Sequence, residues 1–307
     1  MTQRPNFSYF GILCSMKREY QVLLFYKYVG VEDPEKLAQE QRQICESLGL
    51  KGRIIVAGEG INATVEGLTR DTEKYIKQLT KDRRFKDIYF KKSLGTGNSF
   101  PKLSIKVRED IISGDVQEWE VDPNQTTGKY LTPEELHQWI ETGKRFFIVD
   151  MRNEYEQAVG YFQGSILPPL TNFRDLPKAL PLLKDLKNET IVTVCTGGVR
   201  CEKASGYLLN NGFNDVYQLL GGIVSYMEKY PNKHFLGKLY VFDNRVTMGF
   251  NTETKDHLIV GKCAVCGSAA DTYYDCKNLH CQNKRHFISC LNCISKQQGY
   301  CSVCVFQ

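Results

Sequence analysis

Cys195-Thr196-Gly197-Gly198-Val199-Arg200 follows a short apolar run, residues 190–194, and leads into a helix-like segment. Such a run, rich in β-branched residues, predicts a buried strand, and the two glycines predict a tight turn between this strand and the helix. The thiol of Cys195 is therefore expected at the carboxyl end of a strand and at the start of a helix. Catalytic groups of open parallel sheets lie at this edge, so the loop indicates both a fold and a candidate site.

The loop also changes the expected chemistry of its cysteine. Backbone N–H groups of a tight turn and the positive end of the helix dipole stabilise a thiolate or an anionic adduct at Cys195, which makes the sulfur acidic and nucleophilic. Arg200 stays charged and can brace the loop backbone or an incoming anion. The remaining loop backbone comes from Thr196, Gly197, Gly198 and Val199. Four residues separate Cys195 from Arg200, one fewer than in cysteine phosphatases, so a persulfide sulfur or similarly small group fits better than a phosphate. The alternative is a buried, inert cysteine that ends a strand.

The composition is that of a globular protein with more than one domain. The chain has 307 residues, of which 42% are hydrophobic and 24% charged, and a formal net charge of +5. This length predicts two or three domains. Residues 1–6 lack the apolar core of a secretory signal, and no apolar run approaches the about 20 residues that span a bilayer. We therefore expect a cytoplasmic protein without membrane contact; the sequence makes no prediction of its oligomeric state.

We expect an α/β multidomain chain. Residues 1–110 predict the order βαββαβ of a ferredoxin-like (acylphosphatase-like) sandwich, with strands at 20–28, 52–57, 62–66 and 102–108 and helices at 34–48 and 70–80. The polar stretch 122–128 lies in a predicted linker, residues 111–128. A parallel-sheet α/β domain is expected over residues 129–236, and a cysteine-rich zinc-binding tail over residues 237–307.

The central domain has a clear beginning and an alternating pattern. Thr132 is an N-cap candidate, followed by Pro133 at the first helical position and by Glu135 three residues after the cap, which predicts a capping box. Strands are expected at 145–150, 190–194 and 215–219 and a helix at 200–210. This alternation of strands and helices predicts a parallel sheet with helices on both faces.

Eight of the twelve cysteines are concentrated in the last 45 residues as four close pairs. In a reducing compartment such knuckle-like spacing indicates metal, and eight thiolates supply two tetrahedral zinc sites of structural function. Adjacent pairing and an interleaved cross-brace both satisfy the spacing, and His280 or His286 could replace a cysteine. The predicted ligands are Cys263, Cys266, Cys276, Cys281, Cys290, Cys293, Cys301 and Cys304.

A basic segment with interspersed aromatic residues lies between residues 81 and 108. Such a patch can neutralise phosphates while aromatic rings stack on unpaired bases, so we expect an RNA-binding surface. The alternative is a solvated strand and loop whose aromatic rings face the core. The predicted RNA-binding residues are Lys81, Arg83, Arg84, Lys86, Lys91, Lys92, Lys102, Lys106 and Arg108.

Several segments resemble a known pattern. Residues 150–156, 160–166 and 216–223 and the Cys195 loop resemble a rhodanese domain, with Tyr161 in place of the histidine of its Gly-His motif. The extended loop, residues 195–205, is more specific. With Gly-Glu-Gly-Ile-Asn-Ala-Thr-Val at residues 58–65 and the cysteine tail, it is similar to the bacterial rhodanese-containing tRNA uridine hydroxylase family. The resemblance implies oxygen-dependent 5-hydroxylation of the wobble uridine of tRNA, with molecular oxygen as co-substrate and Cys195 as the essential group.

The residues themselves leave other functions open. A sulfurtransferase that carries a cysteine persulfide on Cys195 fits the loop equally well, and a non-enzymatic RNA-binding or assembly module is the third hypothesis. Cys201 is either a resolving thiol for Cys195 or a small apolar residue packed under the helix. We expect no flavin or nicotinamide, and the five dispersed histidines predict no site of two histidines and one carboxylate for oxygen activation.

Overall fold

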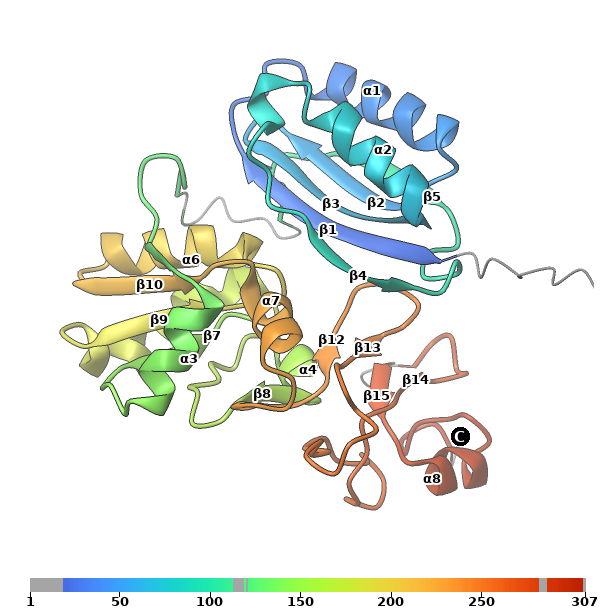
Figure 1. Ribbon diagram of the computed structural model, residues 1–307. Coiled ribbons are helices and arrows are strands. Elements are labelled where there is room, and N and C mark those ends of the chain that lie inside the picture. The colour runs from blue at the N-terminus through green and yellow to red at the C-terminus, as the bar shows by residue number, and fades with distance from the viewer. Residues whose placement is uncertain (1–18, 113–118, 120, 282–285, 306–307) are drawn as a thin grey trace, which may run out of the picture.

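The protein was examined as a computed structural model that describes residues 19–112, 119, 121–281 and 286–305. Three units are visible in Figure 1: an N-terminal α/β sandwich, a central parallel-sheet unit and a C-terminal unit that contacts both. The N-terminal elements are β1 (Tyr20–Tyr28), α1 (Pro34–Ser47), β2 (Lys51–Ala57), β3 (Gly60–Leu68), α2 (Thr69–Leu79), the short 3-10 helix η1 (Arg83–Phe85), β4 (Lys91–Gly95) and β5 (Leu103–Val107).

The N-terminal sheet has the order β4-β1-β3-β2-β5. β4 pairs antiparallel with β1 and is the fourth strand of the ferredoxin-like arrangement, whereas β5 is an additional edge strand parallel to β2. The prediction that residues 102–108 form the fourth strand is therefore wrong, although the segment is a strand. β4 was missed because its sequence, Lys-Lys-Ser-Leu-Gly, has no apolar alternation. Lys91, at the start of β4, is the buried residue of this strand.

The two faces of this sheet have different partners. Leu23 and Phe25 of β1 pack in a core beneath α1 and α2, which cover one face in Figure 1. Leu24 and Tyr26 alternate with them and therefore point to the opposite face, where Leu24 and Tyr26 pack against cores of the central unit. The part of this open face around Leu24 and Tyr26 is thus an interface rather than a solvated surface.

The central sheet is parallel, with the order β6-β10-β9-β7. Helices α5 and α6 pack on one face and α3 and α7 on the other, as the alternation predicts. Thr132 caps α3, and its capping box with Glu135 is confirmed. The elements are β6 (Lys129–Leu131), α3 (Pro133–Glu141), β7 (Phe147–Asp150), α4 (Glu154–Gln157), β8 (Gly160–Phe162), the 3-10 helices η3 (Phe173–Asp175) and η4 (Leu180–Leu186), α5 (Leu176–Ala179), β9 (Thr190–Val194), α6 (Val199–Asn210), β10 (Asp215–Leu219), α7 (Gly222–Lys229) and β11 (Phe235–Gly237).

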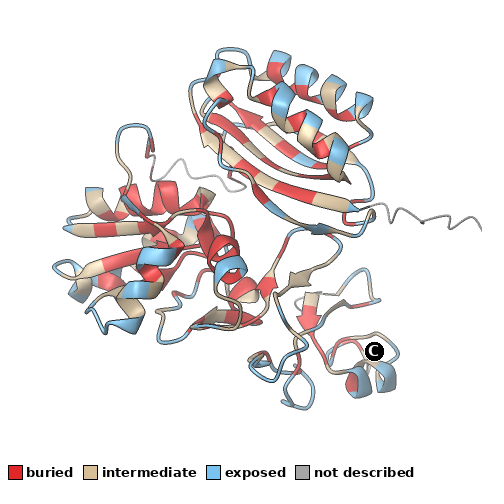
Figure 2. Ribbon diagram, viewed as in Figure 1, coloured by how far each residue is buried: buried red, intermediate tan, exposed pale blue. Residues whose placement is uncertain are grey.

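The described residues of the segment expected to be a linker pack onto the central unit, and residues 113–118 and 120 of this prediction lie outside the described residues. Ile111, Trp119 and Val121 are buried in the core beneath α6. The Ser205 hydroxyl accepts a hydrogen bond from the backbone N–H of Gly128 at 2.7 Å. Figure 2 shows α6, onto which these residues pack, as mostly buried. The described part of the connection between the two domains is therefore packed against the central unit.

The C-terminal unit is small and lies against both larger units. It contains β12 (Leu239–Tyr240), β13 (Thr247–Met248), β14 (Tyr273–Asp275), β15 (His286–Ile288) and α8 (Leu291–Lys296). Arg245 donates to the Leu94 carbonyl of β4 at 3.0 Å, and the Tyr273 hydroxyl donates to the Tyr155 carbonyl of α4. Among the described residues, no helix has the length and apolar character needed to cross a bilayer.

A buried ion pair connects the N-terminal and central units. Lys203 of α6 is 2% exposed, and its Nζ lies 2.7 Å from both Glu59 Oε2 and Asp110 Oδ1. Glu59 also accepts the backbone N–H of Ile111 at 2.9 Å. Burying an ammonium is costly unless carboxylates compensate it, so this contact specifies how the two units pack.

Replacing the buried lysine by an apolar residue should loosen this interface. We expect Lys203→Met to lower the free energy of unfolding by roughly 2–3 kcal/mol, below the range for a fully buried pair, because Glu59 and Asp110 keep some contact with water. Urea unfolding measures the change. The control Lys129→Met removes the exposed pair with Asp215 and should leave the free energy of unfolding nearly unchanged. Equal effects of the two substitutions would contradict a structural role for Lys203.

Candidate active site at the junction of three units

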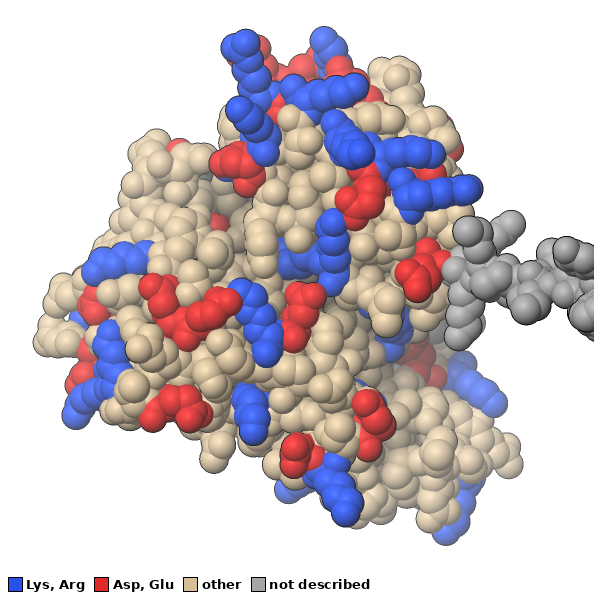
Figure 3. All heavy atoms as spheres, viewed as in Figure 1, with Lys and Arg blue, Asp and Glu red and all other residues tan. Residues whose placement is uncertain are grey.

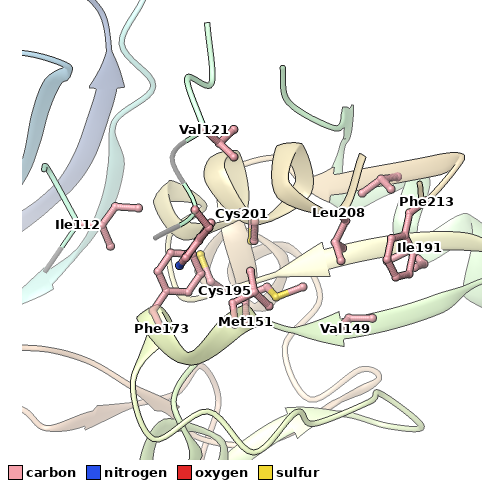
Figure 4. Close-up of a cluster of buried hydrophobic side chains, with 14 of the residues drawn as sticks. Ile112, Val121, Val149, Met151, Phe173, Ile191, Cys195, Cys201, Leu208 and Phe213 are labelled. Carbon is pink, nitrogen blue, oxygen red and sulfur yellow. The ribbon is translucent and has the colours of Figure 1, made fainter. Parts of the chain in front are cut away.

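A pocket of about 320 Å³ lies over the Cys195 loop, and all three units contribute to its wall. The N-terminal sheet supplies Arg53, Asn62 and Thr64, and the central unit supplies Phe173 and the loop. Phe242 of the C-terminal unit closes another side. In Figure 4 the Phe173 ring lies next to Cys195, and Ile112 lies further out in the same buried cluster. Cys195 also lines the pocket but has an exposed fraction of 0%, so a substrate has to enter the pocket to reach the thiol.

The strand-to-helix turn holds the thiol as its sequence predicts. Cys195 follows β9 and precedes α6, and the Gly198 backbone N–H donates to its Sγ at 3.2 Å. The Cys195 carbonyl accepts the N–H of Ile223 at 2.9 Å, which fastens the loop to the start of α7. Gly198 has a φ of 102°, and a Cβ there would lie 2.8 Å from the Tyr26 hydroxyl. Glycine is therefore required by both backbone conformation and space.

The surroundings favour the ionised form of this thiol. Burial by itself raises the pKa of Cys195, but the hydrogen bond from the Cys201 thiol, the charge of Arg200 and the backbone N–H groups of Cys201 and Gly198 lower it to about 6. The pKa of Cys201 is raised well above its ordinary value by burial and by the neighbouring Cys195 sulfur. Of the two thiols, Cys195 is therefore the one that ionises more readily, and Cys201 donates a hydrogen bond to it.

Arg200 is fully engaged by a carboxylate that the sequence interpretation did not single out. Its two terminal nitrogens donate to the two oxygens of Glu156 at 2.5 and 2.7 Å, and both side chains are buried. Glu156 lies on α4, within the segment 150–156 that carries the rhodanese resemblance. Arg152, paired with Asp150 at 2.6 Å, adds positive charge near Glu156. Arg200 thus braces the loop through Glu156 and does not present its fork to an anion.

Lys91 has a different place from the one predicted. It is 5% exposed, its Nζ donates to the Gly197 carbonyl at 2.9 Å, and it lies 4.6 Å from the centre of the Tyr26 ring. Burial lowers the pKa of Lys91 to about 8, although the negative charges of Cys195 and Glu202 oppose this. The RNA-binding prediction is wrong for Lys91, because its ammonium is enclosed behind the Cys195 loop.

The other predicted RNA-binding residues do not form one patch. β4 and β5 are opposite edges of the sheet, so Lys92 is far in strand order from Lys102, Lys106 and Arg108. Lys92 pairs with Glu73 at 2.5 Å, and Arg84 pairs with Asp82 at 2.6 Å. Lys81, Arg83 and Lys86 are exposed near the end of α2. Figure 3 shows Lys and Arg interspersed with Asp and Glu over this part of the molecule.

The eight tail cysteines form two groups that could each hold a metal ion. One group is Cys263, Cys266, Cys290 and Cys293, and the other is Cys276, Cys281, Cys301 and Cys304. The first pair along the chain joins the third, and the second joins the fourth, so the arrangement is the interleaved cross-brace. His286 bonds to Asp275 at 2.7 Å instead of joining a group, and His280 is in neither group. Four thiolates are a donor set that suits zinc.

The expectation that the chain has no grouping of two histidines and one carboxylate is wrong. His137, Glu141 and His234 meet on the central unit, with one donor atom of each within 4.8 Å of the other two. The sequence gives a signal only for the first two, which are spaced i,i+4 on α3. His234 follows about ninety residues later, and only the fold brings it to them.

Lys91 should help to keep Cys195 ionised. Its ammonium stabilises the neighbouring thiolate, so Lys91→Met should raise the pKa of Cys195 by about 1. The alkylation rate of Cys195 by iodoacetamide, followed for its peptide by mass spectrometry, should reach half its plateau near pH 6 in the unaltered protein and at higher pH in the variant.

The neighbouring Lys92→Met is the matched control, because Lys92 is exposed and paired with Glu73. It should leave the alkylation profile in place. A Lys91→Met profile that coincides with the Lys92→Met profile would rule out an electrostatic role for Lys91.

Comparisons with known proteins agree with this architecture. Residues 20–111 match the UPF0176 acylphosphatase-like domain, residues 132–229 the rhodanese-like domain, and residues 236–305 the rhodanase C-terminal family. Among solved structures, a rhodanese-like domain protein from Staphylococcus aureus is 34% identical over 32% of this chain and 90% of its own, with a TM-score of 0.28.

Curated relatives match most of the chain. A protein from Bacillus licheniformis named tRNA uridine(34) hydroxylase is 42% identical over 88% of this chain and 83% of its own length. One of the same name from Staphylococcus aureus is 43% identical over 92% of this chain and 88% of its own. With this identity over nearly its whole length, the chain belongs to the tRNA uridine(34) hydroxylase family.

Proposed function

We propose that this protein is an oxygen-dependent oxidoreductase that hydroxylates C5 of the wobble uridine of tRNA and uses Cys195 as its reactive group. The observation that carries the proposal is an acidic, buried thiol in the wall of a pocket built by all three units. The names of the relatives support the substrate, and a tRNA substrate supports a cytoplasmic location.

The charge balance around the Cys195 thiol favours a neutral base over a phosphate or another anion at this end of the pocket. Arg200 is neutralised by Glu156, and the ammonium of Lys91 is balanced by the Cys195 thiolate, so neither cation is free for an anionic ligand. Phe173 and Phe242 offer rings against which a base can stack. A uracil ring is neutral, flat and small enough for this volume.

The chemistry follows from the position of the thiolate. Addition of the Cys195 sulfur to C6 of uracil forms an S–C6 bond and moves the C5–C6 electron pair towards C5, which then reacts with oxygen. One oxygen atom forms the C5–OH bond and the other leaves as water. This requires two electrons and two protons from a thiol-class or similar reductant. Loss of the C5 proton and expulsion of the Cys195 thiolate restore the aromatic base and the enzyme.

Cys201 is positioned to resolve Cys195 when this residue carries a sulfenate or a persulfide. Its sulfur is hydrogen-bonded to that of Cys195, and both residues are fully buried. A sulfenate or persulfide formed on Cys195 would be attacked by Cys201, which forms a disulfide and releases water or hydrosulfide. The same pair would serve a sulfurtransferase, which is therefore the second candidate function.

The direct test measures both the modified nucleosides of tRNA and the covalent adduct between tRNA and Cys195. In tRNA from a strain that carries Cys195→Ser we expect the loss of 5-hydroxyuridine by nucleoside mass spectrometry. tRNA substituted with 5-fluorouridine should form a covalent adduct with the unaltered protein and none with Cys195→Ser. The control Cys45→Ala removes a buried thiol in the N-terminal core and should keep both. Loss of thiolated nucleosides in the Cys195→Ser strain would instead favour the sulfurtransferase. Unchanged nucleosides in this strain would favour the non-enzymatic module.

We propose that the tRNA backbone contacts the open face of the N-terminal sheet beside the pocket. Arg53 is exposed and lines the pocket. Lys106 is paired in register with Ile55, another pocket residue, so its side chain lies on the same face. Lys102 lies four residues before Lys106, so in an extended chain its side chain lies on the same face. Arg83, in contrast, lies in η1 after α2. Of the predicted basic residues, those on and beside β5 are therefore best placed to bind phosphates.

Charge reversal distinguishes the basic residues beside the pocket from those near the end of α2. We expect Lys106→Glu and Arg53→Glu to weaken tRNA binding and to lower its salt dependence, with a log–log slope reduced by about 1 for each phosphate that is no longer neutralised. Arg83→Glu should have little effect. Filter binding at several salt concentrations measures both quantities. Equally weakened binding by Arg83→Glu and Lys106→Glu would place the RNA elsewhere.

We also propose that each cysteine group holds one structural zinc ion. The C-terminal unit has few buried aliphatic residues, and its two small cores are centred on the cysteines themselves. Such a unit gains its folding free energy from metal. Because Phe242 and Arg245 belong to this unit, zinc would act on the active site by positioning one wall of the pocket.

A further inference from the structure

Two histidines and one glutamate form a compact cluster outside the Cys195 pocket. His137 and Glu141 lie four residues apart on α3 and so share one face of the helix. His234 lies between α7 and β11. One donor atom from each side chain is within 4.8 Å of the other two. None of the three residues lines the Cys195 pocket.

The His137 imidazole is held in place by two tyrosines. Its ring stacks on Tyr230 with 3.9 Å between the ring centroids and an interplanar angle of 13°. Its Nδ1 lies 3.1 Å from the Tyr226 hydroxyl. When Nδ1 donates to this hydroxyl, the unshared electron pair of the ring is on Nε2. A second partner of this kind orients the imidazole ligands of metal sites.

His234 is brought to the cluster by an unusual backbone conformation. Its φ of 56° lies in the left-handed region, which residues with a Cβ rarely adopt. The His234 carbonyl accepts the N–H of Gln163 at 2.7 Å, which fixes the backbone. Its Nε2 lies 2.7 Å from Glu141 Oε1. Costly backbone conformations that bring polar side chains together are common at functional sites.

We propose that His137, Glu141 and His234 bind one divalent first-row transition-metal ion, such as zinc or iron(II). Two imidazole nitrogens exclude a preference for calcium or magnesium, which take oxygen ligands. Three protein ligands leave at least one coordination position open. Glu141 is 58% exposed, so the open position faces solvent.

The site differs in donor set and in place from the two cysteine groups. It contains no thiolate, and it joins α3 to the segment that leads through β11 into the C-terminal unit. His234 Nε2 and Glu141 Oε1 lie 2.7 Å apart, and a bound ion would replace this direct contact by a bond to each side chain.

Cobalt(II) distinguishes this site from the cysteine groups, because thiolate ligands give an intense charge-transfer absorption and imidazole or carboxylate ligands do not. Elemental analysis of full-length protein purified without chelator should first find two zinc ions per chain, one for each cysteine group. Added cobalt(II) should then bind as one further equivalent with weak visible bands and no thiolate absorption.

Substitutions assign the additional cobalt ion. His234→Ala and Glu141→Gln should each weaken its binding by at least about ten-fold. Glu141→Gln alters an exposed side chain, so it tests the site even where His234→Ala disturbs the loop. His280→Ala is the control, because His280 is exposed on the C-terminal unit, and it should bind cobalt as the unaltered protein does. Undiminished binding by Glu141→Gln and His234→Ala, or cobalt bound only with thiolate absorption, would overturn the proposal.

Discussion

The reactive thiol depends on the packing of a glycine loop against the open face of the N-terminal sheet. A Cβ at Gly197 would lie 2.7 Å from Leu24, and one at Gly198 would lie 2.8 Å from the Tyr26 hydroxyl. The side chains of Leu24 and Tyr26 on β1 therefore lie so close to the Cys195 loop that there is no space for a side chain at either glycine. This contact excludes water from the sulfur, and a low local dielectric strengthens each hydrogen bond and charge that acts on it. The acidity of the thiol is thus a property of the assembled units.

Burial of this site is possible because each charge has a partner. Glu156 lies between Arg200 and Arg152, and Lys91 lies behind the Cys195 thiolate. An unpaired charge at such a depth costs several kcal/mol, whereas a complete set costs much less. The network therefore favours a single arrangement of α4, α6 and β4 around the loop. A change to one member alters the ionisation of its neighbours as well as the packing.

Local features of this fold could be predicted from the sequence, because neighbouring residues determine them. The strand, glycine turn and helix around Cys195, the capping box at Thr132 and the cysteine pairs are all of this kind. The role of Lys91 could not be predicted, because its partner, the Gly197 carbonyl, is 106 residues away. A lysine in a polar segment is usually solvated, and only the pairing of β4 with β1 turns this one inward. The same holds for His234, whose neighbours lie on α3.

The C-terminal unit holds one element of each of the other two units in place. Arg245 bonds to β4, the strand that carries Lys91, and Tyr273 bonds to α4, the helix that carries Glu156. Both charged partners of the Cys195 loop are thus on elements held by this unit. Its own cores consist largely of cysteine and aromatic residues, too few to be rigid without cross-links. Metal at the cysteine groups would therefore stabilise the charge network around the thiol indirectly, because the C-terminal unit bonds to the backbone of β4 and α4. None of the cysteines in the two groups lines the pocket.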